Sequence, residues 1–285
     1  MQNIYINSLQ IHSNTTDIGY VVYNPDTGMD FPEVRLTKYF KPGDHGAVVA
    51  NQLYGGRPIQ LNGRISGNTI AQFESNRRAL EAALAIVKDA NAVSQSLLLK
   101  FLTMDNLSLQ AQIYVNNPPQ LVRQSLNHAL FYLDLYAPDP NFYDQSQQSF
   151  TLNIPSGGGV AIPVIFPMVL AAKTGGSVTI NNSGDAYSPP VLTITGPLTS
   201  PYIANLTTGN VFKVNLTLAS SDILVVDMAA KTMVLNGNTN ALQYWDSGNT
   251  WWKLAPGNNL VTLGSSLSAD TGNVQVAFRN AYLGI

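Results

Sequence analysis

The sequence contains no cysteine, which excludes disulfides, thiolate nucleophiles and cysteine-ligated zinc or iron–sulfur sites. Charged residues are also scarce, at 11% of the chain against about 25% in an average soluble domain. The formal net charge of −2 gives no electrostatic reason to expect nucleic acid, an acidic membrane or a strongly charged substrate as a partner. Uncharged polar side chains must therefore cover much of the surface, as they do in many extracellular β proteins and in large assemblies.

The sequence shows neither a secretion signal nor a long apolar run. Its N-terminus has no basic stretch followed by an apolar segment, so a signal peptide is not expected. The longest apolar stretch, residues 160–172, is interrupted by Pro163 and Pro167 and is shorter than the ~18 residues that span a bilayer. We expect no membrane insertion and synthesis in the cytoplasm.

The familiar catalytic and metal-binding motifs are missing as well. His12, His45 and His128 fall in three separate segments, without the spacing of a shared metal site. The pair Asp44-His45 lies in a glycine-bounded loop, where turn formation explains it better than chemistry does. There is no P-loop, nucleophile elbow, H-E-x-x-H or EF-hand pattern. The sequence therefore predicts no catalytic residue, no bound cofactor, no metal and no enzymatic activity.

Carboxylates need separate consideration, because a β-sandwich can carry the acid pair of a glycosidase. From residue 150 onward there is no glutamate, and Asp185, Asp222 and Asp246 stand at turns or strand starts, where aspartates commonly accept hydrogen bonds from backbone amides. Asp227 can face either side of its strand. A polysaccharide-cleaving enzyme is thus a third hypothesis. It would require a pair of carboxylates in one cleft, and it is excluded if Asp222, Asp227 and Asp246 lie far from one another.

The first 145 residues predict an antiparallel β-sheet domain with a single packed helix. Several segments alternate apolar and polar residues, which is typical of half-buried strands, and Pro118-Pro119 is predicted to separate two of them. One stretch, about residues 69–90, has helical spacing instead, and Thr69 with Gln72 fits a capping box at its start. The apolar stripe of this predicted helix consists of Ile70, Phe73, Leu80, Leu84 and Val87.

The composition changes after this domain. Residues 144–163 are rich in Gln, Ser, Gly and Pro, so residues 146–176 are interpreted as a linker with entry strands. Residues 177–285 contain short apolar runs with turn signals every ~8–12 residues, the spacing of a β-sandwich or jelly roll. The expected fold class is mainly β: an antiparallel sheet domain with one helix, followed by a β-sandwich.

All three tryptophans lie close together in the sequence, at Trp245, Trp251 and Trp252, with Tyr244 beside them. Aromatic rings on a sandwich loop can stack on the apolar face of a sugar, which makes these tryptophans candidates for a sugar contact. Alternatively, a hairpin brings them together as part of the core or of an interface. At most one of Trp251 and Trp252 is expected in the core, because neighbouring residues of an extended chain point to opposite faces.

Basic and aromatic residues are interleaved early in the chain, which leaves a nucleic-acid-binding face as a further hypothesis. The negative total charge argues against it. The residues concerned are Arg35, Lys38, Tyr39, Phe40, Lys41, Tyr54, Arg57 and Arg64.

Several longer motifs occur in a characteristic order. The N-terminal part contains GDHGAVVANQLYGGRPIQLNGRI and YAPDPNFYD, and VAIPVIFPMVLAAKTGG follows as a linker. The C-terminal part contains GSVTINNSGDAYSPPVLTITGPLTSPYIANLTTG, then DILVVDMAAKTMVLNG and WWKLAPGNN. In order and spacing these motifs resemble the distal tail proteins of siphophages, the Dit family, over nearly the whole chain.

The resemblance implies a structural protein of the phage or tailocin virion, assembled in the bacterial cytoplasm. It implies a homohexameric ring at the tail tip, formed by the N-terminal domains, with C-terminal galectin-like sandwiches projecting outward. The ring would connect the tail tube protein to the tail-tip hub, or tail-associated protein, and would anchor receptor-binding proteins involved in host adsorption. The tape-measure protein and DNA would pass through its lumen without sequence recognition.

Two sets of residues are candidates for contacts. Tyr54, Gly55, Gly56 and Arg57 are a candidate ring contact, with a turn inside the domain as the alternative. If the protein is instead a carbohydrate-binding host-recognition protein, the region of Trp245, Trp251 and Trp252 would hold the sugar. The chain contains no insertion large enough to be an additional carbohydrate-binding module.

Overall fold

The computed structural model describes residues 1–14, 19–23, 28–88, 93–155, 176–267 and 269–285. The chain divides into two compact units. Unit 1 consists of residues 1–145 together with 282–285, and unit 2 consists of residues 146–281. The last four residues therefore return to the unit in which the chain begins.

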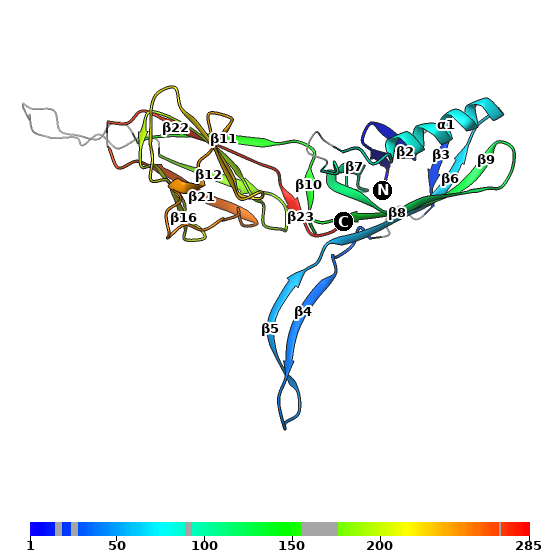
Figure 1. The fold of residues 1–285 in the computed structure, drawn as a ribbon, viewed down its shortest axis with the longest axis horizontal. Helices are drawn as coiled ribbons and strands as arrows, with labels where there is room; N and C mark the ends of the chain where they lie inside the picture. The colour runs from blue at the N-terminus through cyan, green and yellow to red at the C-terminus, as the bar shows by residue number, and fades with distance from the viewer. Residues whose placement is uncertain (15–18, 24–27, 89–92, 156–175, 268) are drawn as a thin grey trace, which may run out of the picture. The chain divides into compact units, whose positions relative to one another are not determined.

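Unit 1 is built on one antiparallel sheet with the strand order β2-β1-β7-β8-β9-β6-β3 (Figure 1). The first half of the long strand β8 pairs with β7 and its second half with β9, so β8 joins the two parts of the sheet. A further strand, β10, also pairs with β8. The strands are β1 (Asn3–Ile6), β2 (Leu9–Ser13), β3 (Tyr20–Val22), β6 (Arg57–Ser66), β7 (Leu97–Leu102), β8 (Ser108–Arg123), β9 (His128–Ala137) and β10 (Phe142–Asp144).

The prediction that Pro118-Pro119 separates two strands is wrong, because β8 continues through both prolines to Arg123. The register against β9 shifts twice here, between Val115 and Asn117 and between Asn117 and Gln120. Beyond Ile113, β8 no longer pairs with β7, so one of its edges is free. Proline is tolerated on such an edge, where no ladder partner needs its missing N–H.

Alternation along β6 shows how the core of unit 1 forms. Ile59, Leu61 and Ile65 are buried, whereas Gln60 and Arg64 between them are exposed. Helix α1 (Ile70–Ala83) packs against β6 and β2 and buries Phe73 and Leu80. Unit 1 therefore has one sheet face covered by the helix and another that stays polar.

The predicted helix begins where expected but ends earlier. Its N-cap is Thr69, whose hydroxyl accepts a hydrogen bond from the Gln72 N–H. It ends at Ala83 instead of near residue 90, and Val87, predicted to continue the apolar stripe, is exposed. Because helices in proteins are stabilised mainly by packing of their apolar face, a last turn without such packing does not form. Residues 89 and 90 lie outside the described residues.

Two strands of unit 1 pair only with each other. Strands β4 (Val34–Phe40) and β5 (Ala47–Tyr54) form a hairpin that Figure 1 shows leaving the sheet as a separate ribbon. Every residue of both strands is exposed. Within unit 1, this hairpin contributes nothing to the core.

Unit 2 is a β-sandwich. Its larger sheet has the order β11-β22-β13-β18-β19-β20 and its smaller sheet the order β12-β21-β15-β16, and one apolar core contains residues of both sheets. A short pair, β14–β17, and a one-turn 3₁₀ helix, η1 (Leu242–Tyr244), complete the unit. The strands are β11 (Gln148–Asn153), β12 (Ser177–Asn182), β13 (Val191–Thr195), β14 (Leu198–Thr199), β15 (Tyr202–Asn205), β16 (Asn210–Lys213), β17 (Thr217–Leu218), β18 (Ile223–Asp227), β19 (Thr232–Leu235), β20 (Thr239–Asn240), β21 (Gly257–Gly264) and β22 (Asn273–Phe278). The last strand of the chain, β23 (Ala281–Tyr282), spans the sequence boundary between the two units.

Buried asparagines fix the turns of the sandwich. The amide of Asn182 donates to the carbonyl of Ala186, and its oxygen accepts from the N–H groups of Gly184 and Ala281. Asn182 is fully buried, so these hydrogen bonds replace the bonds to water that its amide and the backbone groups lose on folding. This explains why the turn after β12 carries asparagine and glycine but almost no charge.

Candidate functional site

The aspartates of unit 2 have local structural partners. Asp227 accepts hydrogen bonds of 2.8 Å from the N–H groups of Ala229 and Ala230, which closes the turn between β18 and β19. Asp246 accepts one of 3.0 Å from the N–H of Gly248, and Asp222 accepts one of 2.8 Å from the N–H of Ala219. The expectation that aspartates serve backbone amides is therefore confirmed for Asp222 and Asp246, and the open question of Asp227 is answered in the same way.

Hydrogen bonds also lower the pKa of two of these carboxyl groups. The side-chain amide of Asn236, followed by the N–H of Ala219, lowers the pKa of Asp222. The N–H of Gly248 is the main cause of the lowered pKa of Asp246. A carboxyl group with a lowered pKa is ionised at neutral pH, whereas glycoside cleavage needs one protonated carboxyl as general acid.

The histidines take part in turn and loop structure. The N–H of His45 donates to the Asp44 carboxylate at 2.7 Å, which is the turn interaction expected from the sequence. The Nδ1 of His12 accepts from the N–H of Val22, and His128 lies 2.7 Å from the hydroxyl of Ser125. Within the described ranges, no three His, Cys, Asp or Glu side chains are grouped so that they could hold a metal ion.

The hairpin β4–β5 presents an unusual amount of apolar surface. Phe40 is 77% exposed and Tyr39 64%, and several aliphatic side chains accompany them. Large apolar side chains on both strands are left in water, which is typical of a surface that another molecule covers. The exposed apolar residues of the hairpin are Val34, Leu36, Tyr39, Phe40, Val48, Val49, Leu53 and Tyr54.

The four residues proposed from the sequence as a ring contact lie at the base of this hairpin. Tyr54 ends β5 and is exposed, whereas Gly55 is buried and its N–H donates to the carbonyl of Glu33 at 2.6 Å. Gly56 lies so close to the hydroxyl of Tyr136 that a Cβ atom would clash at 2.1 Å. Of the four residues, only Tyr54 presents a side chain at the surface, together with the rest of β5 before it.

Arg57 is buried inside unit 1, with 1% of its surface exposed. Its guanidinium donates to the backbone carbonyls of Gly28, Asp30, Pro140 and Leu283. It also lies 4.3 Å from the centre of the Phe142 ring. Arg57 therefore ties the segment before β4 and the end of the chain to the start of β6.

This burial has an electrostatic consequence. Loss of hydration lowers the pKa of Arg57 to about 10, although the nearby charges of Asp30 and Asp139 act in the opposite direction. Burial also removes Arg57 from the basic set considered as a nucleic-acid face. Arg35, Lys38 and Arg64 of that set are exposed.

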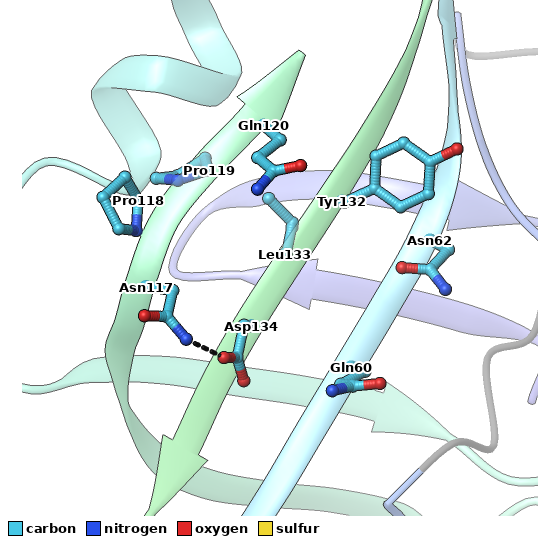
Figure 2. Close-up of a pocket in the computed structure, with 9 residues that line it drawn as sticks. All are labelled: Gln60, Asn62, Asn117, Pro118, Pro119, Gln120, Tyr132, Leu133 and Asp134. Carbon is cyan, nitrogen blue, oxygen red and sulfur yellow. Dashed lines mark hydrogen bonds between the residues drawn. The ribbon is translucent and has the colours of Figure 1, made fainter. Parts of the chain in front are cut away.

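The uncovered face of the sheet in unit 1 has a shallow polar depression over β6, β9 and β8 (Figure 2). Figure 2 shows Asn117 directed at Asp134 of the neighbouring strand, and the side-chain amide of Asn117 donates to that carboxylate. Asn116 donates to the same oxygen at 3.0 Å. The lining is dominated by amide and ring side chains: Gln60, Asn62, Asn117, Pro118, Pro119, Gln120, Tyr132, Leu133 and Asp134.

The three tryptophans have different environments. Trp252 is 2% exposed and belongs to the core of the sandwich, whereas Trp245 and Trp251 are half-buried. The rings of Trp245 and Trp251 lie 4.3 Å apart, and the fully buried Phe212 is 5.5 Å from the former. The structure thus brings all three together but leaves only Trp245 and Trp251 partly accessible.

Part of the chain matches a known protein family, and the whole chain matches a known fold. Residues 183–282 match the family described as siphovirus-type tail component, C-terminal domain. The fold matches the SPP1 Dit protein, described as a paradigm of the hub adsorption apparatus in phages that infect Gram-positive bacteria, with a TM-score of 0.64, 13% identity and 98% coverage of both chains. Residues 183–282 are thus similar to the C-terminal domain of siphovirus-type tail components, and the chain as a whole has the fold of a Dit protein.

Two structures of the phage p2 baseplate in its activated conformation, with Ca and with Sr, are also similar. Both are 8% identical to this chain, with TM-scores of 0.48 and 0.47, and they cover 97% and 96% of this chain and 98% of their own. No curated protein sequence is significantly similar.

The resemblance inferred from the sequence motifs and the mainly β fold are both confirmed. The family match covers part of unit 2, whereas before residue 183 the relation is one of fold. Both of these matches are to proteins described as parts of a phage tail or adsorption apparatus. No helix in the described part of the chain is long and apolar enough to cross a membrane.

Sequence reasoning missed the hairpin as a functional feature. In residues 34–40 and 47–54, apolar side chains occupy both alternating sets of positions. The same pattern occurs in Ile223–Val226, which form part of β18 in the sandwich and bury Leu224 and Val226. The sequence alone therefore did not distinguish the hairpin from a packed strand pair.

Proposed function

We propose that this chain is a distal tail protein of the Dit type and forms a homohexameric ring at the tail tip, which joins the tail tube protein to the tail-tip hub and anchors receptor-binding proteins. The observation that carries the proposal is the hairpin β4–β5, whose strands pair only with each other and expose every residue. A two-stranded hairpin without further packing is at best marginally stable in water. An apolar hairpin of this kind is therefore best explained by a partner that covers it.

A second copy of the same chain is the partner that we propose. Each subunit of a ring offers one surface and receives another, so the hairpin of one copy can pack on its neighbour around a closed ring. The low charge of the chain favours contacts of this kind, since charged side chains are depleted at buried interfaces. In this arrangement, Tyr54 belongs to the contact, and Gly55, Gly56 and Arg57 fix the base of the hairpin.

The polar face of the sheet in unit 1 suits a channel. We propose that the face of Figure 2 lines the lumen through which the tape-measure protein and DNA pass. Its side chains are mostly amides, and its one carboxylate, Asp134, accepts hydrogen bonds from two asparagines. Such a surface gives little attraction for phosphates, so DNA would slide past without being held.

The same proposal assigns the protein a structural role without catalysis, in a virion assembled in the host cytoplasm. In support, Asp222 and Asp246 have lowered pKa values, and Asp227 closes a turn. The carboxylates required by the glycosidase hypothesis are thus used by the fold itself.

The proposal is tested by the mass of the purified protein, measured by light scattering after gel filtration and checked by negative-stain images. We expect a ring near six times the 30.8 kDa chain mass. The double variant Phe40→Ser/Val49→Ser should lose the ring but keep its fold, because both side chains are exposed in the isolated chain.

The matched control replaces two equally exposed apolar residues outside the hairpin, Leu126→Ser/Leu206→Ser, and should keep the ring. The proposal is rejected if the wild-type protein stays monomeric at about 100 μM, where even an interface with a Kd near 1 μM would be occupied. A ring that survives the hairpin variant would also reject it.

A further inference from the structure

Unit 2 carries a groove that the proposed ring does not need. It has a volume of about 590 Å³ and lies beside Trp251, with Tyr187, Thr208, Asn210, Thr250 and Lys253 among the residues that line it. This volume is in the range of about 300–1,000 Å³ that is usual for small-molecule sites. The groove is formed by segments of unit 2 alone.

The aromatic wall of the groove is rigid before any ligand binds. The Trp251 ring lies 4.3 Å from that of Trp245 and 6.0 Å from that of Phe212, which is fully buried. The turn between the two tryptophans is fastened to β16 through Asn249, whose side chain exchanges two hydrogen bonds of 2.7 Å with the backbone of Lys213. A ligand that stacks on Trp251 would therefore lose little binding energy to ordering of the protein.

The polar part of the lining forms a short network. The hydroxyl of Thr250 donates to the side-chain oxygen of Asn210, and the amide of Asn210 donates to the hydroxyl of Thr208. Each of the three groups can still make further hydrogen bonds, as donor, acceptor or both. Lys253 is the only charged residue that lines the groove, so the site does not favour a polyanion.

We propose that this groove binds a hydroxyl-rich saccharide, whose ring stacks on Trp251 and whose hydroxyls bond to Thr208, Asn210 and Thr250. The apolar C–H face of a pyranose matches an aromatic ring, and its hydroxyls match side chains that both donate and accept. This binding function goes beyond the structural role proposed above and does not depend on the ring.

The test is a glycan array of neutral and acidic saccharides, followed by fluorescence titration with the saccharides that bind. All three tryptophans of the chain lie at or beside the groove, so their emission should change on binding. Trp251→Ala should weaken binding by about tenfold or more, and Thr250→Val by about fivefold.

Tyr187→Ala provides a second variant that is safe for the fold, because Tyr187 is exposed, and it too should weaken binding. The matched control is Tyr202→Ala, an exposed tyrosine of unit 2 outside the groove, which should leave binding unchanged. The proposal is overturned if nothing on the array binds, or if the Trp251 and Tyr187 variants bind as tightly as the wild-type protein. Neither result bears on the oligomeric mass measured for the proposed ring, so the two proposals can be rejected independently.

Discussion

Two hairpins of this protein have the same local topology but opposite relations to a core. In β18–β19 of the sandwich, Leu224, Val226 and Met233 are buried while the residues between them face outward. In β4–β5 of unit 1, no residue of either strand is buried. One hairpin is held by its own unit. The other needs a surface that the single chain does not supply.

The difference lies in the surroundings of the two hairpins and not in β propensity or in the sequence pattern. Both hairpins are rich in valine, leucine and other strand formers. Adjacent apolar residues occur in both, at Val225-Val226 in β18 and at Tyr39-Phe40 and Val48-Val49 in β4–β5. In β18 one set of side chains is covered by the sandwich core, whereas in β4–β5 both sets are exposed. An apolar hairpin that its own unit leaves uncovered on both faces is a candidate assembly surface.

The largest expected effect concerns the anchor of the exposed hairpin. Arg57→Met would remove the donor of hydrogen bonds to four backbone carbonyls, at Gly28, Asp30, Pro140 and Leu283. We expect unit 1 to lose about 3–5 kcal/mol of unfolding free energy, because a hydrogen bond to a charged group contributes about 1.5–3 kcal/mol and several are lost together.

Urea unfolding followed by far-UV circular dichroism measures the loss. Tryptophan emission reports unit 2 in the same samples, because all three tryptophans are there. Arg64→Met, at an exposed position of the same strand, is the control and should change little. If the Arg57 variant unfolds like the wild type, the hairpin is not anchored through this guanidinium.

The second prediction compares one leucine from each hairpin. Leu224 is 0% exposed and Leu36 is 48% exposed. Leu224→Ala should destabilise the sandwich by about 2–5 kcal/mol, because it leaves a cavity in the core. Leu36→Ala should cost less than about 0.5 kcal/mol in the monomer, as surface substitutions usually do.

The effects of the two substitutions on assembly should have the reverse order. Leu36→Ala should lower the fraction of protein that light scattering finds in the ring, whereas Leu224→Ala should lower it only under conditions in which the protein unfolds. Equal destabilisation of the monomer by the two substitutions would mean that β4–β5 is packed on its own unit after all.

Much of the architecture could be predicted from sequence because it depends on local rules. The mainly β fold follows from period-two alternation, and the helix start follows from Thr69 and Gln72. The end of the helix could not be predicted, since only packing decides whether Val87 joins the apolar face. The strand through Pro118-Pro119 was missed because the freedom of one β8 edge is a property of the sheet.

The candidate sites divide in the same way. The clustering of the tryptophans is visible in the sequence, but the buried position of Trp252 and the groove beside Trp251 arise from segments distant in sequence. Arg57 was predicted to take part in a ring contact or, alternatively, in a turn inside the domain, and its full burial was not foreseen, since a positive charge is rarely fully buried. Its carbonyl partners come from three separate parts of the chain, which no local pattern reveals.

A smaller effect is expected at the two turns. Asp227 accepts two backbone N–H groups in the turn of β18–β19, and Asp44 accepts one at the tip of β4–β5. Asp227→Ala should cost about 1 kcal/mol, the usual net value of such hydrogen bonds. Asp44→Ala should not be measurable in thermal unfolding, because the hairpin tip carries no tertiary packing. A measurable loss at Asp44 would show that the free hairpin adds to the stability of unit 1.

The smallest effect is a dependence on pH that only the packed hairpin should show. Asp222 precedes β18 and binds Asn236, which follows β19, so it closes the open end of this hairpin. The hydrogen bond from Asn236 lowers the pKa of Asp222 in the folded state. A carboxyl group with a lowered folded pKa stabilises the fold above its unfolded pKa of about 3.9, and this contribution is lost as the pH falls through the folded value.

Asp222→Asn should therefore flatten the acid side of the stability curve of unit 2, below about pH 4, and should leave it unchanged near neutral pH apart from a constant offset. Tryptophan emission during acid titration measures this in unit 2, since the reporters are within it. Asp185→Asn, in a turn of the same unit that is not part of the hairpin, serves as the control. If the two variants have the same acid midpoint as the wild type, the closure of β18–β19 by Asp222 does not contribute to its stability, and the difference between the hairpins rests on their apolar residues alone.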